Sequence, residues 1–292
     1  MSTKQVAFLG PEASFTHVAT KSLFQQETLV PIRTIPECIE AVASGEVDIA
    51  VVPLENALEG IVPLTIDYLF HEAEVYVIAE LLSPIEQHLM VHPSNVKRWD
   101  EMTSVYSHPH ALAQCHKYLS YRFGKVPLEQ SSSTAAAAKY VSENEDLCIA
   151  AIGNTSAAAE YGLQIVEHNI HDFHFNHTRF FVISKNNHCI QRTGHTDQVK
   201  TTVMITLPKD DRSGALHQVL SVFAWRQLNL SKIESRPLKT GLGQYFFIID
   251  ILEDEMKPMM IGAIEELKAL GCGVKSLGSY YTYETKNEAI RS

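Results

Sequence analysis

Short apolar runs alternate with alanine-rich amphipathic segments through the first two thirds of this chain, and this alternation constrains its fold most. Up to residue 184 the pattern is typical of α/β units built around mostly parallel sheets. The expected strands are residues 5–9, 47–52, 75–81, 88–91, 104–106, 147–152 and 179–183. The expected helices are residues 15–24, 35–43, 111–119 and 134–141.

A polar stretch at residues 185–199 has no apolar periodicity and is expected to be a linker. After it, strands are expected at residues 201–207, 230–236, 244–252 and 274–281, and helices at 215–227 and 258–270. This βαββαβ order is the ferredoxin-like arrangement. The sequence therefore predicts a first domain over residues 1–184, a second over 200–282, and a fraying tail over 283–292.

Bulk composition excludes several classes of protein. The 292 residues exceed the usual size of one hydrophobic core, so at least two domains are expected. A formal net charge of -10, with no window dense in Lys and Arg, argues against nucleic acid as a partner. The five cysteines are scattered and form no Cys-x-x-Cys pair, which favours a reducing cytoplasm over a disulfide framework or zinc site. No signal peptide or membrane-spanning apolar stretch is apparent, so we expect neither export nor membrane insertion.

Asn176-His177-Thr178-Arg179 stands directly before the apolar run 180–183. It places a hydroxyl and a guanidinium side by side, a pairing that suits a small substrate with a carboxylate and a leaving oxygen. Thr also favours strands and Arg often snorkels at a strand end, so the dipeptide alone is equally compatible with a structural role.

Two more polar clusters follow expected strands. In the segment Gly10-Pro11-Glu12-Ala13-Ser14-Phe15-Thr16, Ser14 or Thr16 can cap the next helix, whose free backbone N–H groups can also bind an anion. Glu55 and Asn56 lie just past the carboxyl end of a buried strand, where open α/β sheets bind ligands. The alternative for Asn56 is a side-chain bond to the backbone that shapes the turn.

Hydroxyl groups and histidines cluster in the segment between residues 107 and 134. Ser107-His108-Pro109-His110 contains a Ser-His pair, but adjacent turn residues rarely point at each other and no Gly-x-Ser-x-Gly elbow is present. The two histidines have no nearby carboxylate to complete a metal site. Ser131-Ser132-Ser133-Thr134 precedes an alanine-rich helix; capping explains one hydroxyl, and the others are candidate ligand donors.

Taken together and in this order, these segments resemble the prephenate dehydratase family over nearly the whole chain. The matching segments are Gly10-Pro11 with Ser14-Phe15-Thr16, Val52-Pro53-x-Glu55-Asn56, Ser107-His108-Pro109-x-Ala111-Leu112, the Ser-Thr-Ala-Ala-Ala run at Ser133, and Asn176-x-Thr178-Arg179-Phe180. The resemblance implies a two-lobed catalytic domain like the periplasmic binding proteins, with lobe 1 at about 1–80 and 162–184 and lobe 2 at about 81–161. Neither a chorismate mutase helix bundle nor a dinucleotide fingerprint is apparent, so a monofunctional enzyme is expected.

The C-terminal part resembles an ACT regulatory domain. The residues that carry this likeness are Gly214-Ala215-Leu216 and Glu234-Ser235-Arg236-Pro237. In the family these segments meet at an ACT dimer interface and bind L-phenylalanine as a feedback inhibitor. A glycine before a helix N-terminus permits the close approach of a carboxylate. The resemblance thus implies self-association, as a homodimer or tetramer.

The family reaction removes carbon dioxide and water from prephenate to give phenylpyruvate, and aromatisation drives it without a metal or cofactor. The resemblance makes Thr178 the donor to the leaving oxygen and Arg179 a bidentate carboxylate clamp, with Asn56 and Ser107 as further catalytic donors. Lobe closure is expected to bring Ser107 towards Thr178. Further substrate contacts are expected from Ser14, Phe15, Thr16, Glu55, Ser131, Ser132, Ser133, Thr134, Asn176 and Phe180.

The sequence departs from the family pattern at two positions, and it leaves two alternative functions open. Ala13 stands where the family often has glycine, and Ala57 stands where it often has serine or threonine. The missing hydroxyl puts a ligand role for position 57 in doubt. Arogenate, with an amine in place of the keto oxygen, is an alternative substrate that the sequence does not separate from prephenate. A non-enzymatic two-lobed sensor is the rival from another class.

Overall fold

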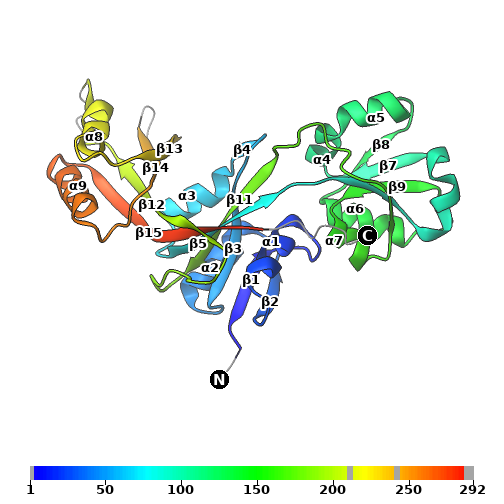
Figure 1. Cartoon of the computed structure of the whole chain (residues 1–292), viewed down its shortest axis with the longest axis horizontal. Helices are drawn as coiled ribbons and strands as arrows, with labels where there is room; N and C mark the ends of the chain where they lie inside the picture. Colours follow the sequence, from blue (N-terminus) through cyan, green and yellow to red (C-terminus); the bar gives the residue numbers. More distant parts are fainter. Residues whose placement is uncertain (1–2, 209–212, 240–243, 286–292) are drawn as a thin grey trace.

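Three bodies follow one another along the long axis of the chain in the computed structural model, which describes residues 3–208, 213–239 and 244–285 (Figure 1). Lobe 1 lies in the middle, lobe 2 at one end and the ACT domain at the other. Lobe 1 comprises β1 (Gln5–Leu9), α1 (Phe15–Leu23), β2 (Thr28–Ile32), α2 (Ile35–Ser44), β3 (Ile49–Asn56), β4 (Gly60–Ile61), α3 (Pro63–His71), β5 (Tyr76–Pro84) and β11 (His177–Ser184).

Lobe 2 is the segment inserted between β5 and β11. It comprises β6 (His88–Val91), the 3-10 helix η1 (Pro93–Glu101), β7 (Ser104–Ser107), α4 (Pro109–Gln114), α5 (His116–Phe123), β8 (Leu128–Gln130), α6 (Thr134–Ser142), β9 (Ile149–Gly153), α7 (Thr155–Glu160) and β10 (Gln164–Glu167). The helix expected over 111–119 is therefore two helices, which meet at Cys115.

The two sheets are mixed rather than mostly parallel. In lobe 1, β2, β1 and β3 are parallel neighbours, but β11 runs antiparallel to both β3 and β5. The lobe 2 sheet has the order β10-β6-β9-β7-β8, in which β9, β7 and β8 are parallel and the other pairs antiparallel. The expectation of mostly parallel sheets thus holds for only part of each lobe, since β11 and β6 each run antiparallel to both of their neighbours.

The chain crosses between the lobes later than expected in both directions. It leaves lobe 1 between Pro84 and His88 and returns between Glu167 and His177. The expected crossings near residues 80 and 162 are too early, because β5 pairs with β11 as far as Pro84 and β10 belongs to lobe 2. Backbone hydrogen bonding connects the two crossings, since Ile85 N–H donates to the carbonyl of Asn176 at 2.9 Å.

The ACT domain confirms the expected βαββαβ order. Its elements are β12 (His195–Thr206), α8 (Ala215–Ala224), β13 (Leu230–Pro237), β14 (Tyr245–Ile251), α9 (Pro258–Ala269) and β15 (Gly273–Glu284). They form an antiparallel sheet in the order β13-β14-β12-β15. Alternate residues of β12 and β14 form an apolar core with α8 and α9, including Val203, Ile205 and Ile249. The residues that alternate with them along β12 and β14, including Met204 and Phe246, point to the other face of the sheet and join the core of lobe 1.

One continuous sheet joins the ACT domain to lobe 1. The end of β15 pairs in parallel with β5, with Thr282 opposite Glu80 and Glu284 opposite Leu82. Two strands therefore extend beyond the expected limits: β12 begins inside the expected linker, and β15 runs into the expected tail. Residues 286–292 of that tail lie outside the described residues. The sheet order β13-β14-β12-β15-β5-β11-β3-β1-β2 places the regulatory strands and β11 in one hydrogen-bonded array.

Candidate active site

Thr178 lies at the start of β11, immediately after the chain returns from lobe 2. It is paired across the strands with Asn56, and Asn56 Nδ2 donates to Thr178 Oγ1 at 2.9 Å. The side chain is buried, with 8% of its surface exposed. Within residues 3–208, 213–239 and 244–285 the structure records no acceptor for the hydroxyl proton of Thr178. The Thr178 hydroxyl is thus held in place by Asn56 while its own proton remains available to a ligand.

Asn56 also organises the loop that reaches lobe 2. Its Oδ1 accepts from the backbone N–H groups of Leu58 and Glu59 at 3.0 and 3.3 Å. Glu59 then pairs with His110 Nδ1 at 2.5 Å and accepts from Gln114 Nε2 at 3.2 Å, both on α4. This Asx turn gives Asn56 the structural role that the sequence left open, and the bond to Thr178 adds a second role.

A second contact joins the lobes beside α1. Asn154 Nδ2, at the N-cap of α7, donates to the carbonyl of Ala13 at 3.1 Å. Ala13 is buried among the alanines of α6 and α7. We call the region between this contact and the Glu59–His110 pair the lobe junction; Thr178 and Asn56 lie on the lobe 1 side of it.

Two buried amide oxygens at the crossings have no hydrogen-bond partner among the described residues. They are Asn176 Oδ1 on the return crossing and Gln87 Oε1 on the outward crossing. Their side chains are 3% and 2% exposed, respectively. A buried acceptor without a donor is costly, and a ligand hydroxyl or amide satisfies it. Sequence reasoning named Asn176 but missed Gln87, because a lone Gln before a short apolar run forms no pattern.

The first turn of α1 faces the same side of the lobe 1 sheet as Thr178, since Phe15 and Phe180 pack in one apolar cluster. Ser14 caps this helix: its Oγ accepts from His17 N at 3.2 Å and donates to the Leu9 carbonyl. Ser14 is thus engaged within the protein, and Thr16 is buried. The first backbone N–H groups of α1 have no intrahelical acceptors, so they remain the anion donors of this segment.

Phe180 lies in the core rather than on a ligand-accessible surface. Its ring is 1% exposed among Phe8, Val182 and other residues beneath α1. The expected substrate contact from Phe180 is therefore corrected to a packing role. Phe15 is partly exposed at the edge of the same cluster.

The hydroxyl groups of lobe 2 divide into engaged and free ones. Ser107 is fully buried and donates to the Ile152 carbonyl at 2.7 Å, so the expected donation to the substrate is corrected to a bond within the lobe 2 sheet. Ser133 caps α6 by accepting from Ala136 N at 2.9 Å. Ser131 is tied to Ser107 only through its backbone N–H, and Ser132 is exposed. Thr134 is nearly buried in the first turn of α6.

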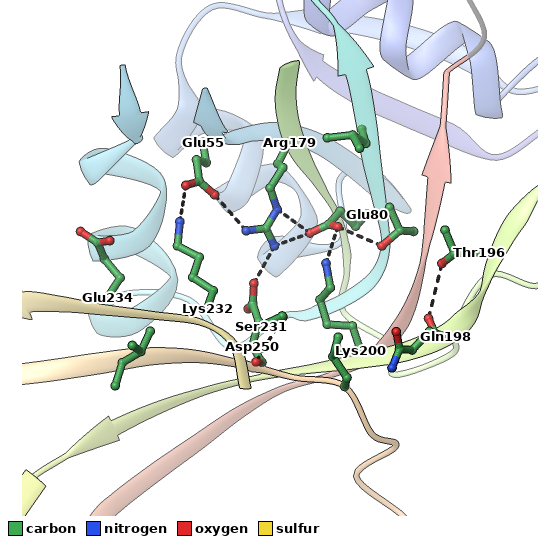
Figure 2. Close-up of a pocket in the computed structure, with 14 residues that line it drawn as sticks. Glu55, Glu80, Arg179, Thr196, Gln198, Lys200, Ser231, Lys232, Glu234 and Asp250 are labelled. Carbon is green, nitrogen blue, oxygen red and sulfur yellow. Dashed lines mark hydrogen bonds and ion pairs between the residues drawn. The ribbon is translucent and has the colours of Figure 1, made fainter. Parts of the chain in front are cut away.

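Arg179 lies on the opposite face of β11 from Thr178, because successive strand residues alternate. Its Nε and one terminal nitrogen contact Glu80 Oε2 at 2.9 and 2.5 Å, and the other terminal nitrogen donates to Glu55 Oε2 at 2.9 Å. The nitrogen that contacts Glu80 also donates to Asp250 Oδ2 of β14 at 2.6 Å. The guanidinium is thus held by three carboxylates next to the ACT domain (Figure 2). The expectation that Arg179 and Thr178 flank one substrate is wrong for this arrangement, and Glu55 faces away from it too.

Two lysines of the ACT domain complete this group of charges. Lys200 pairs with Glu80 at 2.7 Å, and Lys232 pairs with Glu55 at 2.5 Å. We call Glu55, Glu80, Arg179, Lys200, Lys232 and Asp250 the interdomain charge network. The network lines a cavity of 770 Å³ between lobe 1 and strands β12, β13 and β14 (Figure 2).

The pKa values of Glu80 and Glu55 are both lowered from the usual value. Burial by itself raises the pKa of Glu80, but the positive charges of Arg179 and Lys200 outweigh it. Burial likewise opposes ionisation of Glu55, and hydrogen bonds from Lys232 and Arg179 lower its pKa overall. Burial by itself lowers the pKa of Arg179, but the negative charges of Glu80 and Asp250 outweigh it and raise the pKa overall. All three groups are therefore ionised at neutral pH.

This predicts an acid-sensitive contribution to stability. A carboxylate with a lowered folded-state pKa stabilises the protein above its unfolded pKa, about 4.5 for Glu80, and loses this contribution as the pH falls through the folded value. The difference in unfolding free energy between wild type and Glu80→Gln should be constant from pH 7 to about pH 5 and shrink below it. Urea unfolding across this range measures it; a difference that stays constant down to pH 3 contradicts the assignment.

The two segments implied in L-phenylalanine binding occupy different parts of the ACT domain. Gly214 has a φ of 89° and begins α8 without a side-chain cap, Ala215 is buried, and Leu216 packs on the domain core. Residues 234–237 lie on β13, the edge strand of the sheet.

Residues 234–237 themselves alternate between the two faces of β13. Glu234 lines the cavity of the charge network, and Arg236 contacts Asp67 of α3 at 3.2 Å. Ser235 and Pro237 are exposed on the other face. This segment therefore contacts lobe 1 and also presents an exposed edge.

Metal-binding clusters and membrane-spanning helices are both absent from the described residues. No group of three His, Cys, Asp or Glu side chains there is placed to hold a metal ion. Across residues 3–208, 213–239 and 244–285, no helix is long and apolar enough to cross a membrane.

Comparison with known proteins identifies the family. The family model described as prephenate dehydratase matches residues 6–188. Prephenate dehydratase of Bacillus subtilis (strain 168) is 53% identical over 283 residues, which cover 96% of this chain and 99% of that protein.

Solved structures share the whole architecture. Prephenate dehydratase of Arthrobacter aurescens, solved in complex with L-Phe, has a TM-score of 0.84 at 35% identity, covering 94% of this chain and 89% of that one. GqqA, described as a novel type of quorum quenching acylase, has a TM-score of 0.81 at 25% identity, covering 96% of this chain and 98% of that one. Proteins described with two different activities thus share this fold, so the fold alone does not assign the activity. The chain belongs to the prephenate dehydratase family, the lyases that convert prephenate to phenylpyruvate.

Proposed function

We propose that the chain converts prephenate to phenylpyruvate at the lobe junction, with Thr178 donating to the departing hydroxyl. The observation that carries this proposal is the Thr178 hydroxyl, oriented by Asn56 with its proton free, beside the crossings between the lobes. The reaction loses CO2 and the ring hydroxyl together, and the hydroxyl leaves as water once protonated. Aromatisation of the ring supplies the driving force.

Thr178 is best suited to give a strong hydrogen bond or relay a proton. A free threonine hydroxyl is too weak an acid to act as a general acid tuned near neutral pH. Donation from a preorganised position to the developing negative charge on the leaving oxygen is worth about two to four orders of magnitude in rate. Asn56 supplies the preorganisation, because its Nδ2 fixes the Thr178 oxygen and its Oδ1 fixes the loop of Glu59.

The two substrate carboxylates need donors other than Arg179. On the Thr178 side of the sheet these are the backbone N–H groups at the start of α1, at Phe15 and Thr16, where the helix dipole also favours an anion. From lobe 2 the hydroxyls of Ser131, Ser132 and Thr134 are the further donors. The unpartnered oxygen of Asn176 accepts from a substrate hydroxyl. Glu59–His110 and Asn154–Ala13 hold the lobes together around such a ligand.

The proposal is tested by incubating the purified protein separately with prephenate and arogenate. Phenylpyruvate formed from prephenate, at a kcat/KM at least tenfold above that for arogenate, is the expected result. Phenylalanine formed faster from arogenate instead assigns the alternative substrate. No aromatic product from either overturns the proposed activity.

L-Phenylalanine is proposed to inhibit by binding the ACT domain at Gly214-Ala215-Leu216 and Glu234-Ser235, with a second copy of the chain completing the site. Among the described residues, no strand pairs with the outer edge of β13 and no side chain caps the start of α8. Both features support this assignment, because they leave backbone groups open to a partner or a ligand carboxylate. The oligomer is thus at least a homodimer built through ACT domains.

Replacing Glu234 and Ser235 with alanine should raise the L-phenylalanine concentration for half inhibition about tenfold or more, because both side chains are removed from the effector segment. Steady-state turnover of prephenate at increasing L-phenylalanine measures the shift. Ser221→Ala, in the last turn of α8, is the matched hydroxyl control. Unchanged inhibition in the double variant places the effector elsewhere.

A further inference from the structure

Two cross-strand pairs lie back to back on β3 and β11. Thr178 is opposite Asn56, and the next residues along, Arg179 and Glu55, are opposite each other. Each pair is bonded: Asn56 Nδ2 to Thr178 Oγ1 at 2.9 Å on one face, and Arg179 to Glu55 Oε2 at 2.9 Å on the other. Any shift of the Arg179–Glu55 pair therefore moves the backbone that carries Thr178 and Asn56.

The ACT domain holds both members of the second pair. Lys232 of β13 contacts Glu55 at 2.5 Å, and Asp250 of β14 contacts Arg179 at 2.6 Å. Asp250 is itself fixed within the ACT sheet, since Thr202 Oγ1 donates to its Oδ1 at 2.7 Å. Lys232 precedes Glu234 by two residues, so both side chains point to the same face of β13. The strand that carries residues 234–235 thus contacts β3, which carries Asn56, and its neighbour β14 contacts β11, which carries Thr178.

The network combines balanced charge with room to move. Three carboxylates face three cations, and Glu80 and Asp250 are each 2% exposed. Such charges are stable only while they remain paired, so the network favours a small set of discrete arrangements. The cavity of 770 Å³ beside it lets the ACT strands shift without compressing a packed core.

We infer that Lys232 and Asp250 are positioning residues through which the ACT domain sets the geometry of Thr178 and Asn56. The inference rests on the proposed function, and it names the route by which an effector on β13 alters turnover at the lobe junction. L-Phenylalanine bound at residues 234–235 displaces β13, Lys232 and Asp250 pull on Glu55 and Arg179, and the Asn56–Thr178 pair leaves its productive position. Inhibition requires that L-phenylalanine bind the two arrangements with different affinity.

The test separates coupling from effector binding with Lys232→Met and Asp250→Asn in the full-length protein. For each variant, calorimetry measures L-phenylalanine binding, and steady-state kinetics measure kcat/KM for prephenate with and without saturating L-phenylalanine. We expect both variants to bind L-phenylalanine, while the ratio of the two kcat/KM values shrinks about fivefold or more relative to wild type. Lys232→Met removes the ion pair between β13 and Glu55, and Asp250→Asn removes the one between β14 and Arg179. Each change thus weakens the connection between the ACT domain and the strands that carry Asn56 and Thr178.

Lys275→Met is the matched control, because it removes one positive charge from the same domain interface. Lys275 Nζ donates to the Ala73 carbonyl at 2.7 Å and contacts Glu74 at 3.2 Å, and it has no contact with the network. The control should lose thermal stability yet keep the wild-type kcat/KM ratio. The inference is overturned if Lys232→Met and Asp250→Asn keep the wild-type ratio, or if Lys275→Met loses as much of it.

Failure of the inference is distinguishable from failure of the proposed function. A wild-type protein that makes no phenylpyruvate from prephenate refutes the function itself. A wild type that is active but insensitive to L-phenylalanine refutes the regulatory role of the ACT domain, and the inference with it. A wild type that is both active and inhibited, together with variants that respond like wild type, refutes the inference alone.

Discussion

Thr178→Val should lower kcat for prephenate by about a hundredfold or more while the protein stays folded. Valine keeps the β-branched shape of threonine and its fit in β11, so the change removes the hydroxyl without creating a cavity. The hydroxyl is the donor to the leaving oxygen, and a donor used mainly in the transition state affects kcat more than KM. Thr178→Ala should give a similar loss.

The control for this prediction is Thr178→Ser, which keeps the hydroxyl and should retain much more activity than valine or alanine. Any activity that Thr178→Ser lacks relative to wild type reflects the extra rotamer freedom of serine. Circular dichroism and thermal unfolding establish that each variant is folded. Near-normal turnover in Thr178→Val removes the hydroxyl from the mechanism.

Arg179→Met should destabilise the protein by about 3–5 kcal/mol, the usual cost of removing one partner from a buried ion pair. Three carboxylates, Glu55, Glu80 and Asp250, lose a shared partner, and Glu80 and Asp250 are almost inaccessible to water. Methionine keeps the length and apolar character of the arginine stem, so the loss comes mainly from the missing charge. Urea unfolding at neutral pH measures the change.

Lys139→Met supplies the exposed comparison. Lys139 pairs with Glu143 four residues along α6, and both side chains are more than half exposed. Such a helical pair contributes only about 0.3–0.5 kcal/mol. If Arg179→Met costs no more than Lys139→Met and instead raises KM alone, Arg179 contacts the substrate and the network does not have the structural role described above.

Local periodicity was sufficient to predict much of the fold. The expected bounds of β1 and β6 match the structure, and α1, α2 and α6 differ from expectation by only one residue. The βαββαβ order of the ACT domain also follows from local pattern. Elements with weak apolar periodicity were missed, including β2, α3 and β10, which contain proline or several polar residues.

Strand direction and the lobe crossings were not predictable in the same way. Whether β11 runs parallel or antiparallel to β3 depends on pairing between residues more than a hundred positions apart. The apolar run of β5 shows where a strand exists but not which partner extends it to Pro84.

The candidate site was predicted only in part, and strand alternation explains the largest error. Adjacent residues on a strand face opposite sides, so Thr178 and Arg179 were never both available to one ligand. The resemblance to the family nevertheless assigned both residues to one substrate. The carboxylates around Arg179 come from residues 55, 80 and 250, and no local pattern connects them. Gln87 was missed for the same reason, since only the fold shows that its amide oxygen is buried without a donor.

The most direct test is a crystal structure of the Thr178→Val protein with prephenate bound. We predict the substrate at the lobe junction, with its ring hydroxyl beside position 178 and within hydrogen-bonding distance of Asn56 or Asn176. A carboxylate of the substrate should lie against the first turn of α1. Prephenate bound instead in the cavity beside Arg179, or its absence from the lobe junction at saturating concentration, contradicts the account.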